Sequence, residues 1–124
     1  MKKKSPKRKL QLECDALMQT WGRLYYKDCL VCGGKYNCLH HYFTKGSSAA
    51  LRYDKKNLIP ICGGCHTKHH LSNLPTVGNT INRKKGKAWV DDLTRRQHDY
   101  VKTNMQYYRD MFEYWTEEIN KIKK

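Results

Sequence analysis

Two cysteine pairs of identical spacing constrain the fold more than any other feature of the sequence. Cys29 and Cys32 form the first pair, and Cys62 and Cys65 form the second. Each Cys-x2-Cys pair can present two thiolates to one metal ion, and two such pairs complete a tetrahedral four-cysteine zinc site. Because four protein ligands leave no open coordination position, a zinc ion bound there is structural. We therefore expect zinc to join the two segments and to support the folding of a small core.

A disulfide or a redox role suits these cysteines less well than zinc. A disulfide between Cys62 and Cys65 is disfavoured because the two residues lie so close in sequence and have a matching pair upstream. A redox role is disfavoured because no βαβ pattern surrounds either pair. Cys14 is expected to be a small core residue on the apolar face of a helix, and Cys38 is assigned no role.

The sequence predicts a cytoplasmic protein. No apolar run approaches the length of a membrane span, and the N-terminal residues MKKKSPKRKL lack the hydrophobic stretch of a secretory signal. In a reducing cytoplasm, six cysteines indicate metal binding rather than disulfides.

Positive charge predicts a polyanionic partner. The 124 residues carry a net charge of +14, and the sequence pI is about 9.6. Part of this charge lies in residues 1–9, which we expect to be a disordered basic arm. So large an excess exceeds what solubility requires and favours nucleic acid over a membrane surface, although composition does not distinguish DNA from RNA.

Apolar periodicity predicts helices towards both ends of the chain. An amphipathic helix is expected over residues 10–27 because its apolar positions recur at intervals of four and three residues. From Lys87 onward the pattern is again helical and contains a heptad-like stripe. This stripe either packs on the rest of the domain or forms a homodimer, and the sequence favours neither. The stripe consists of Val101, Met105, Tyr108, Phe112, Trp115, Ile119 and Ile122.

The middle of the chain has a different character. Residues 28–61 combine cysteine, glycine and aromatic residues with short apolar runs, which predicts a compact β-rich segment with loops. One strand is expected around residues 38–42 and another over residues 57–61. A helix should follow from the second cysteine pair to about Leu71, and residues 72–86 are expected to form a loop.

The histidines predict a second metal. His66 and His70 are four residues apart on the expected helix, so both can bind one ion, while His69 is a less favoured substitute. His40 and His41 lie on a strand, where neighbouring side chains point to opposite sides. One of them can therefore join the metal while the other acts as a free base. Each histidine taken singly is more often a surface or packing residue, and only their combination favours a site.

These motifs resemble the HNH nucleases of the ββα-metal fold, many of which carry a supplementary four-cysteine zinc. The resemblance covers residues 29–70, in the order C-x2-C, HH, N, C-x2-C-H-x3-H. More loosely, the first helix, the LRYDKKN segment and the helical tail are similar to phage recombination endonucleases of the lambda Rap (NinG) type. One departure is the segment YFTKGSS after the histidine pair, where many members have a proline or two glycines.

The resemblance implies roles for individual residues. His40 would ligate a catalytic metal, completed by His66 and His70, and His41 would be the general base. Asn57 would hold the loop that orients His41. Three imidazole ligands suit Zn²⁺, Mn²⁺ or Ni²⁺ better than Mg²⁺ by preference, without fixing the metal used in the cell. Basic residues near the site or in the following loop are candidate DNA contacts, with solvated charge as the alternative: Lys45, Arg52, Arg83, Lys84, Lys85 and Lys87.

The resemblance implies an α+β protein. Its expected parts are a basic arm (1–9), an HNH nuclease domain with its N-terminal helix (10–86) and a C-terminal helical extension (87–124). The expected activity is metal-dependent DNA hydrolysis, acting on branched or recombination-intermediate DNA such as a Holliday junction, in the host cytoplasm if a phage encodes the protein. The alternative is a non-catalytic zinc module that binds nucleic acid. An RNA-binding zinc protein is disfavoured because no aromatic-rich RNA-recognition motif is present.

Overall fold

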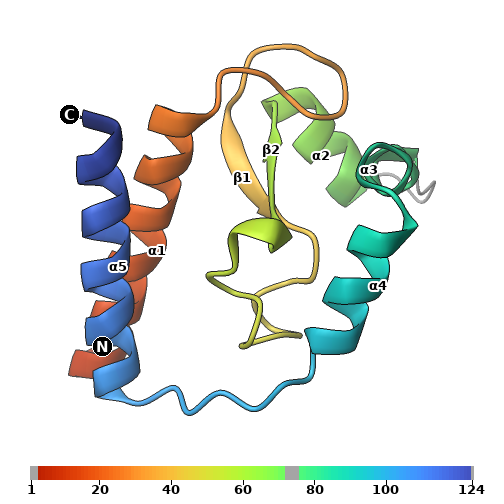
Figure 1. The fold of residues 1–124 in the computed structure, drawn as a ribbon. Coiled ribbons are helices and arrows are strands. Elements are labelled where there is room, and N and C mark those ends of the chain that lie inside the picture. The colour runs from red at the N-terminus through yellow and green to blue at the C-terminus, as the bar shows by residue number, and fades with distance from the viewer. Residues whose placement is uncertain (1–2, 72–75, 124) are drawn as a thin grey trace. The chain divides into compact units, whose positions relative to one another are not determined.

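The computed structural model describes residues 3–71 and 76–123, without the side chains of residues 68–71 and 76. The protein is mixed α and β, mostly helical, with a two-stranded sheet (Figure 1). It divides into two compact units. The first unit combines Met1–Tyr25 with Val101–Lys124, and the second is the continuous segment Tyr26–Tyr100.

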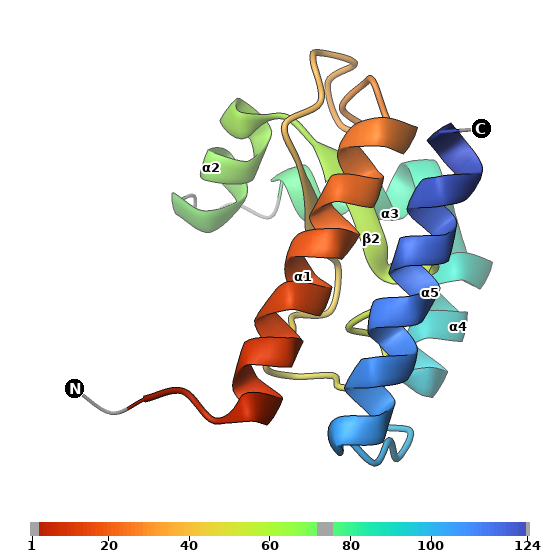
Figure 2. The same ribbon diagram turned by 90° about the vertical axis from the view of Figure 1, so that its left-hand side faces the viewer.

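The first unit is a pair of long helices. Helix α1 (Pro6–Tyr25) and helix α5 (Met105–Lys123) lie side by side in both views (Figures 1 and 2). Trp21 of α1 and Trp115 of α5 are buried between them, with ring centroids 5.3 Å apart. The helix pair thus buries part of the heptad-like stripe, namely Tyr108, Trp115 and Ile119, whereas Phe112 of the same stripe is 39% exposed.

Both helices of the first unit begin at polar caps that correct the expected boundaries. Helix α1 starts at Pro6, so residues 6–9 are helical rather than part of a disordered arm. The Ser5 hydroxyl accepts a hydrogen bond from the Arg8 N–H at 3.1 Å, and proline is well suited to the first helical position. Likewise, the Asn104 side chain accepts from the Tyr107 N–H at 2.9 Å, so α5 begins after Asn104 and excludes Val101 from the helix.

The second unit is built on a small antiparallel sheet. Strand β1 (Cys38–His41) pairs with strand β2 (Leu58–Ile61); both strands were expected from the sequence, although Tyr42 and Asn57 lie outside them. A short 3₁₀ helix, η1 (Lys55–Asn57), precedes β2, and helix α2 (Gly63–Leu71) follows it. The segment before β1 is less β-rich than expected, with one isolated bridge between Asp28 and Lys35 in the described residues.

Two further helices complete the second unit, and the first of them corrects the expected loop over residues 76–85, while residues 72–75 of that loop lie outside the described residues. Helix α3 (Thr76–Lys85) contains Val77 and Ile81, four residues apart, which pack against Ile59 and Ile61 of β2. Burial of this one face outweighs the poor helix propensity of the asparagine, glycine and threonine residues around it.

Helix α4 (Lys87–Arg96) follows directly after Gly86, whose φ of 90° favours glycine. The helical tail expected from Lys87 onward is thus interrupted over residues 97–104. This break and the pairing of α1 with α5 replace the expected division at residues 86 and 87. This division into units could not be predicted from the sequence, because pairing between helices at opposite ends of a chain leaves no local pattern. Within the described residues, no helix is both long and apolar enough to cross a membrane.

Candidate metal centre

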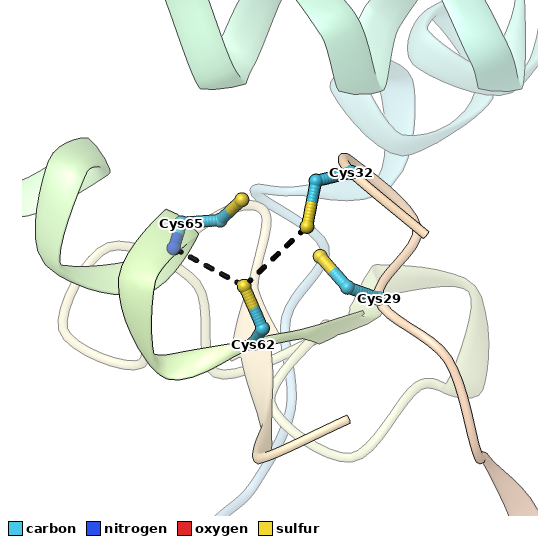
Figure 3. A group of neighbouring side chains, drawn as sticks. All are labelled: Cys29, Cys32, Cys62 and Cys65. Atoms are coloured by element: carbon cyan, nitrogen blue, oxygen red, sulfur yellow. Dashed lines mark hydrogen bonds between the residues drawn. The ribbon is translucent and has the colours of Figure 1, made fainter. Parts of the chain in front are cut away.

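The four predicted zinc ligands lie together in the second unit. Cys29 and Cys32 come from the turn before β1, Cys62 follows β2, and Cys65 lies in the first turn of α2. Their sulfur atoms point towards one another (Figure 3), and all lie within 4.8 Å of each other. Cys29 and Cys65 are buried and belong to the apolar core that includes Ile59 and Ile61.

Each cysteine pair is held in a turn that directs a backbone N–H at a sulfur. The Gly34 N–H donates to Cys32 Sγ at 3.4 Å, and the Cys65 N–H donates to Cys62 Sγ at 3.3 Å. Gly33 has a φ of 75°, a conformation that favours glycine and lets the chain reverse after Cys32. These N–H groups stabilise thiolates, which are the metal-binding form of cysteine.

The electrostatics of the four thiols calls for a cation. Burial raises the pKa of the Cys65 thiol, and the neighbouring sulfurs raise it further, to about 12. Burial also raises the pKa of the Cys29 thiol, but backbone hydrogen bonds at Cys32, Cys62 and Val31 outweigh it and bring the pKa to about 7. Four thiolates so close together repel one another unless a positive ion lies among them.

The donor set fits zinc. Sγ of Cys32 and Sγ of Cys62 lie 3.6 Å apart, far beyond a disulfide bond, and all four cysteines are free. Tetrahedral zinc with Zn–S bonds of about 2.3 Å separates its sulfur ligands by about 3.8 Å. The cluster is therefore arranged as a four-thiolate site that could hold zinc.

His40 and His41 lie on opposite faces of β1. His40 pairs with Ile59 in the sheet register, and its ring lies edge-on to that of His66 on α2, with centroids 5.4 Å apart. His41 pairs with Leu58 instead. Both residues are largely buried, with His40 7% and His41 8% exposed. Strand alternation thus separates one histidine that faces His66 from one that does not.

A backbone carbonyl selects the tautomer of the neutral His41 ring. Nε2 of His41 lies 2.9 Å from the carbonyl oxygen of Arg52. Because a carbonyl oxygen only accepts hydrogen bonds, Nε2 carries the proton, and the basic lone pair of the neutral ring is on Nδ1. This arrangement gives the histidine a defined basic atom.

Asn57 holds together the segment that supplies this carbonyl. The side chain is fully buried, accepts a hydrogen bond from the Phe43 N–H at 2.8 Å, and donates to the carbonyl oxygens of Phe43 and Leu51 at 2.9 and 3.1 Å. Both ends of the segment between β1 and β2 are thereby joined. That Asn57 holds a loop that orients a catalytic His41 stays a prediction.

Part of the predicted histidine set lies outside the described side chains. The backbone of His70 belongs to α2, but the side chains of His69 and His70 are among those not described. The structure also places Cys38, to which the sequence assigned no role, next to His66. Its Sγ lies 3.6 Å from Nδ1 of His66. Among the residues that the structure describes, the four cysteines are the one group of three or more His, Cys, Asp or Glu side chains that lie close enough together to hold a metal ion.

The predicted DNA contacts differ in their surroundings. Lys45 and Arg83 are exposed. Arg52 lies over the ring of Tyr53, with 5.7 Å between the guanidinium carbon and the ring centroid. Lys84 has a structural role that its sequence position did not reveal, because Nζ donates to the carbonyl oxygen of Leu30 at 2.7 Å and anchors α3 to the first cysteine turn.

Two further lysines of the predicted set make contacts with α4. Nζ of Lys85 lies 5.7 Å from the ring centroid of Trp89, and Lys87 pairs with Asp91 at 3.0 Å. Lys85 is exposed, and the Lys87 side chain is 90% exposed.

Comparisons of the chain with protein-family models, with curated proteins and with solved structures find no match.

Proposed function

We propose that the protein is a metal-dependent DNA endonuclease of the HNH type, with β1, β2 and α2 as a ββα-metal core. The observation that carries the proposal is the opposed placement of two neighbouring histidines. His40 faces His66 of α2, whereas His41 is held by the Arg52 carbonyl on the other side of the strand. Such a pair can divide metal binding and proton transfer between adjacent residues.

In this proposal His40, His66 and His70 would hold the catalytic metal. A divalent cation there would stabilise the negative charge on the phosphate oxygens and on the leaving oxygen. His41 acts as general base. Its Nδ1 takes a proton from a water molecule as that oxygen bonds to phosphorus, while the bond from phosphorus to the leaving sugar oxygen breaks and that oxygen gains a proton from solvent.

Asn57 and the four cysteines support this chemistry without taking part in it. Asn57 fixes the segment whose carbonyl orients His41. Zinc bound by the four cysteines would join the turn before β1 to the start of α2, the helix that carries His66. The catalytic side chains would thus be held on a rigid frame, as positioned catalysis requires.

Charge supports nucleic acid as the substrate. The net charge of +14 favours a polyanion, and exposed basic residues such as Lys45 and Arg83 lie in the same unit as the histidines. Branched or recombination-intermediate DNA is the proposed substrate because of the resemblance to phage recombination endonucleases.

The second candidate is a zinc-binding module that holds nucleic acid without cutting it. The observation in its favour is that the four cysteines form a cluster by themselves and need no histidine. Such a module requires one metal ion per chain. The endonuclease requires a second ion, bound by the histidines.

Metal analysis combined with calorimetric titration separates the two candidates. Zinc-loaded wild-type protein should bind one further Mn²⁺, Ni²⁺ or Zn²⁺ ion per chain. His66→Ala should lose this ion while keeping the first zinc, and His98→Ala, which changes an exposed histidine, should keep both. A single metal ion per chain in the wild type under all these conditions contradicts the endonuclease proposal.

A further inference from the structure

The segment between β1 and β2 carries the carbonyl that binds His41, yet the regular element described within it is only the short helix η1. Its shape therefore depends on side-chain anchors. Asn57 is one of them. Two others come from the end of α4, about forty residues downstream in sequence and outside the part of the chain that resembles a nuclease.

The first of these anchors is Arg96, in the last turn of α4. Nη1 of Arg96 donates to Oδ2 of Asp54 at 2.5 Å, and Nη2 donates to Asp92 on its own helix at 2.8 Å. The other carboxylate oxygen of Asp54 accepts from the Lys56 N–H at 2.9 Å and thereby caps η1. Arg96 thus connects α4 through Asp54 to the short helix that ends at Asn57.

The second anchor is Ser48, whose side chain is buried. Its hydroxyl donates to the carbonyl oxygen of Gln97, directly after α4, at 2.7 Å. The same hydroxyl accepts from the Leu51 N–H at 3.2 Å. Arg52 therefore lies between two points, Ser48 and Asp54, that are both attached to the end of α4.

We infer that Arg96 is a positioning residue for His41, because through Asp54 it fixes the segment whose Arg52 carbonyl orients the imidazole. This inference rests on the proposed function for its catalytic consequence. The side chain of Arg96 is 30% exposed and its cationic head is occupied by two carboxylates, so it is poorly placed to act as a phosphate contact. Loss of the anchor should let the carbonyl move, and small displacements of a catalytic group reduce turnover strongly.

The neighbouring Arg95 provides a matched control. It also pairs with Asp92, at 2.6 Å, but its side chain is mostly exposed and has no contact with Asp54 among the interactions described. Arg95→Ala and Arg96→Ala remove the same charge from the same helix. Any difference between the two variants therefore reports the connection to Asp54 rather than attraction for DNA.

The kinetic test compares kcat and KM of Arg96→Ala, Arg96→Lys and Arg95→Ala on DNA. We expect Arg96→Ala to lower kcat about tenfold or more, without a larger effect on KM than Arg95→Ala causes. Arg96→Lys should restore part of kcat because it keeps one donor for Asp54. Equal kcat values for the two alanine variants, or a loss confined to KM, would overturn the inference.

A spectroscopic test does not depend on cleavage. The Nε2–H of His41 should give a protected imidazole signal in nitrogen-edited NMR of wild type and Arg95→Ala, and this signal should be lost or shifted in Arg96→Ala. If the wild type does not cut DNA, loss of the signal in Arg96→Ala still supports the positioning role. The absence of cleavage then contradicts only the proposed function. An unchanged signal overturns the inference.

A second variant tests whether the effect of Arg96→Ala comes from misfolding rather than from loss of the contact with Asp54. Asp54→Asn keeps an oxygen to cap η1 but removes the charge that Arg96 binds. It should reproduce the effect of Arg96→Ala, and the double variant should be no worse than either single one. Additive losses in the double variant would mean that the two residues act separately, which also contradicts the inference.

Discussion

At the scale of the residue, Asn57 combines complete burial with complete hydrogen bonding. Its amide group serves one backbone N–H and two backbone carbonyls, none of which is in regular pairing between the strands. Removing the amide would leave these groups without their partner in the interior. A buried polar group that is left without a partner costs more free energy than a hydrogen bond contributes on balance to stability.

Asn57→Ala should therefore destabilise the second unit by about 3 kcal/mol, which denaturant unfolding followed by the backbone amide NMR signals of that unit can measure. Asn37→Ala, at an exposed asparagine of the same unit, should change stability by less than about 0.5 kcal/mol. Similar stabilities for the two variants would show that the hydrogen bonds of Asn57 do not hold the segment.

Residue identities predicted the cluster of four cysteines but not the hydrogen bonds that anchor the segment between β1 and β2. The cluster of Cys29, Cys32, Cys62 and Cys65 was predicted correctly. The prediction was possible because each Cys-x2-Cys pair forms a local turn that can be recognised from its spacing alone. The contact between Asp54 and Arg96 spans 42 positions, and surface charges give no sign of which partner they meet. Cys38 lacked a recognisable role for the same reason.

At the scale of the element, zinc is expected to stabilise one unit and not the other. The cysteine cluster contributes Cys29 and Cys65 to the core of the second unit, whereas the first unit is held by packing of α1 on α5. If the cysteines bind zinc, the free energy of metal binding would therefore add to the folding free energy of the second unit alone.

Cys29→Ser should lower zinc content and unfold the second unit, leaving the helical signal of α1 and α5 in circular dichroism. Cys14→Ser is the matched control, because Cys14 is buried in α1 and donates to the Tyr108 carbonyl at 3.2 Å, away from the cluster. This variant should keep its zinc. A Cys29→Ser protein with unchanged zinc content and thermal stability would contradict the structural role.

The stripe on α5 offers two positions with different expected effects. Ile119 is 7% exposed and packs within the first unit, whereas Phe112 is 39% exposed. Ile119→Asp should therefore destabilise this unit by about 3 kcal/mol, and Phe112→Asp should cost less than about 1 kcal/mol.

Sedimentation of the same two variants tests the homodimer that the sequence left open as one of two alternatives. Since Phe112 is the exposed large apolar residue of the stripe, Phe112→Asp should weaken self-association without unfolding the chain. A wild type that stays monomeric at tens of micromolar, with and without DNA, would rule out a dimer at these concentrations.

The sequence located the strands and α2 well because their signals are local. Short apolar runs with flanking turns identify β1 and β2, and the second cysteine pair marks the start of α2. Helix α3 was missed because Val77 and Ile81 become informative only once the β2 face that they cover is known. The Ser5-Pro6 start of α1 was a readable signal that the basic composition obscured.

At the scale of the whole molecule, the excess of positive charge should govern binding to DNA. If several lysines and arginines neutralise phosphates, affinity should fall steeply as salt rises from about 50 to 200 mM, because bound counterions are released on association. Fluorescence anisotropy with a labelled duplex measures this slope. An affinity that does not change with salt concentration would show that the net charge of +14 does not contribute to DNA binding.

The most direct test of the account is cleavage of DNA by zinc-loaded protein supplied with Mg²⁺, Mn²⁺, Ni²⁺ or Zn²⁺. Wild type and His98→Ala should nick supercoiled plasmid and cut a four-way junction when the metal is present and not when it is chelated. His41→Ala should bind metal and DNA normally but cut about 10² to 10⁴ times more slowly, because a base acts in the transition state. A wild type that cuts no DNA with any of these metals, or a His41→Ala variant as fast as wild type, would contradict the central claim.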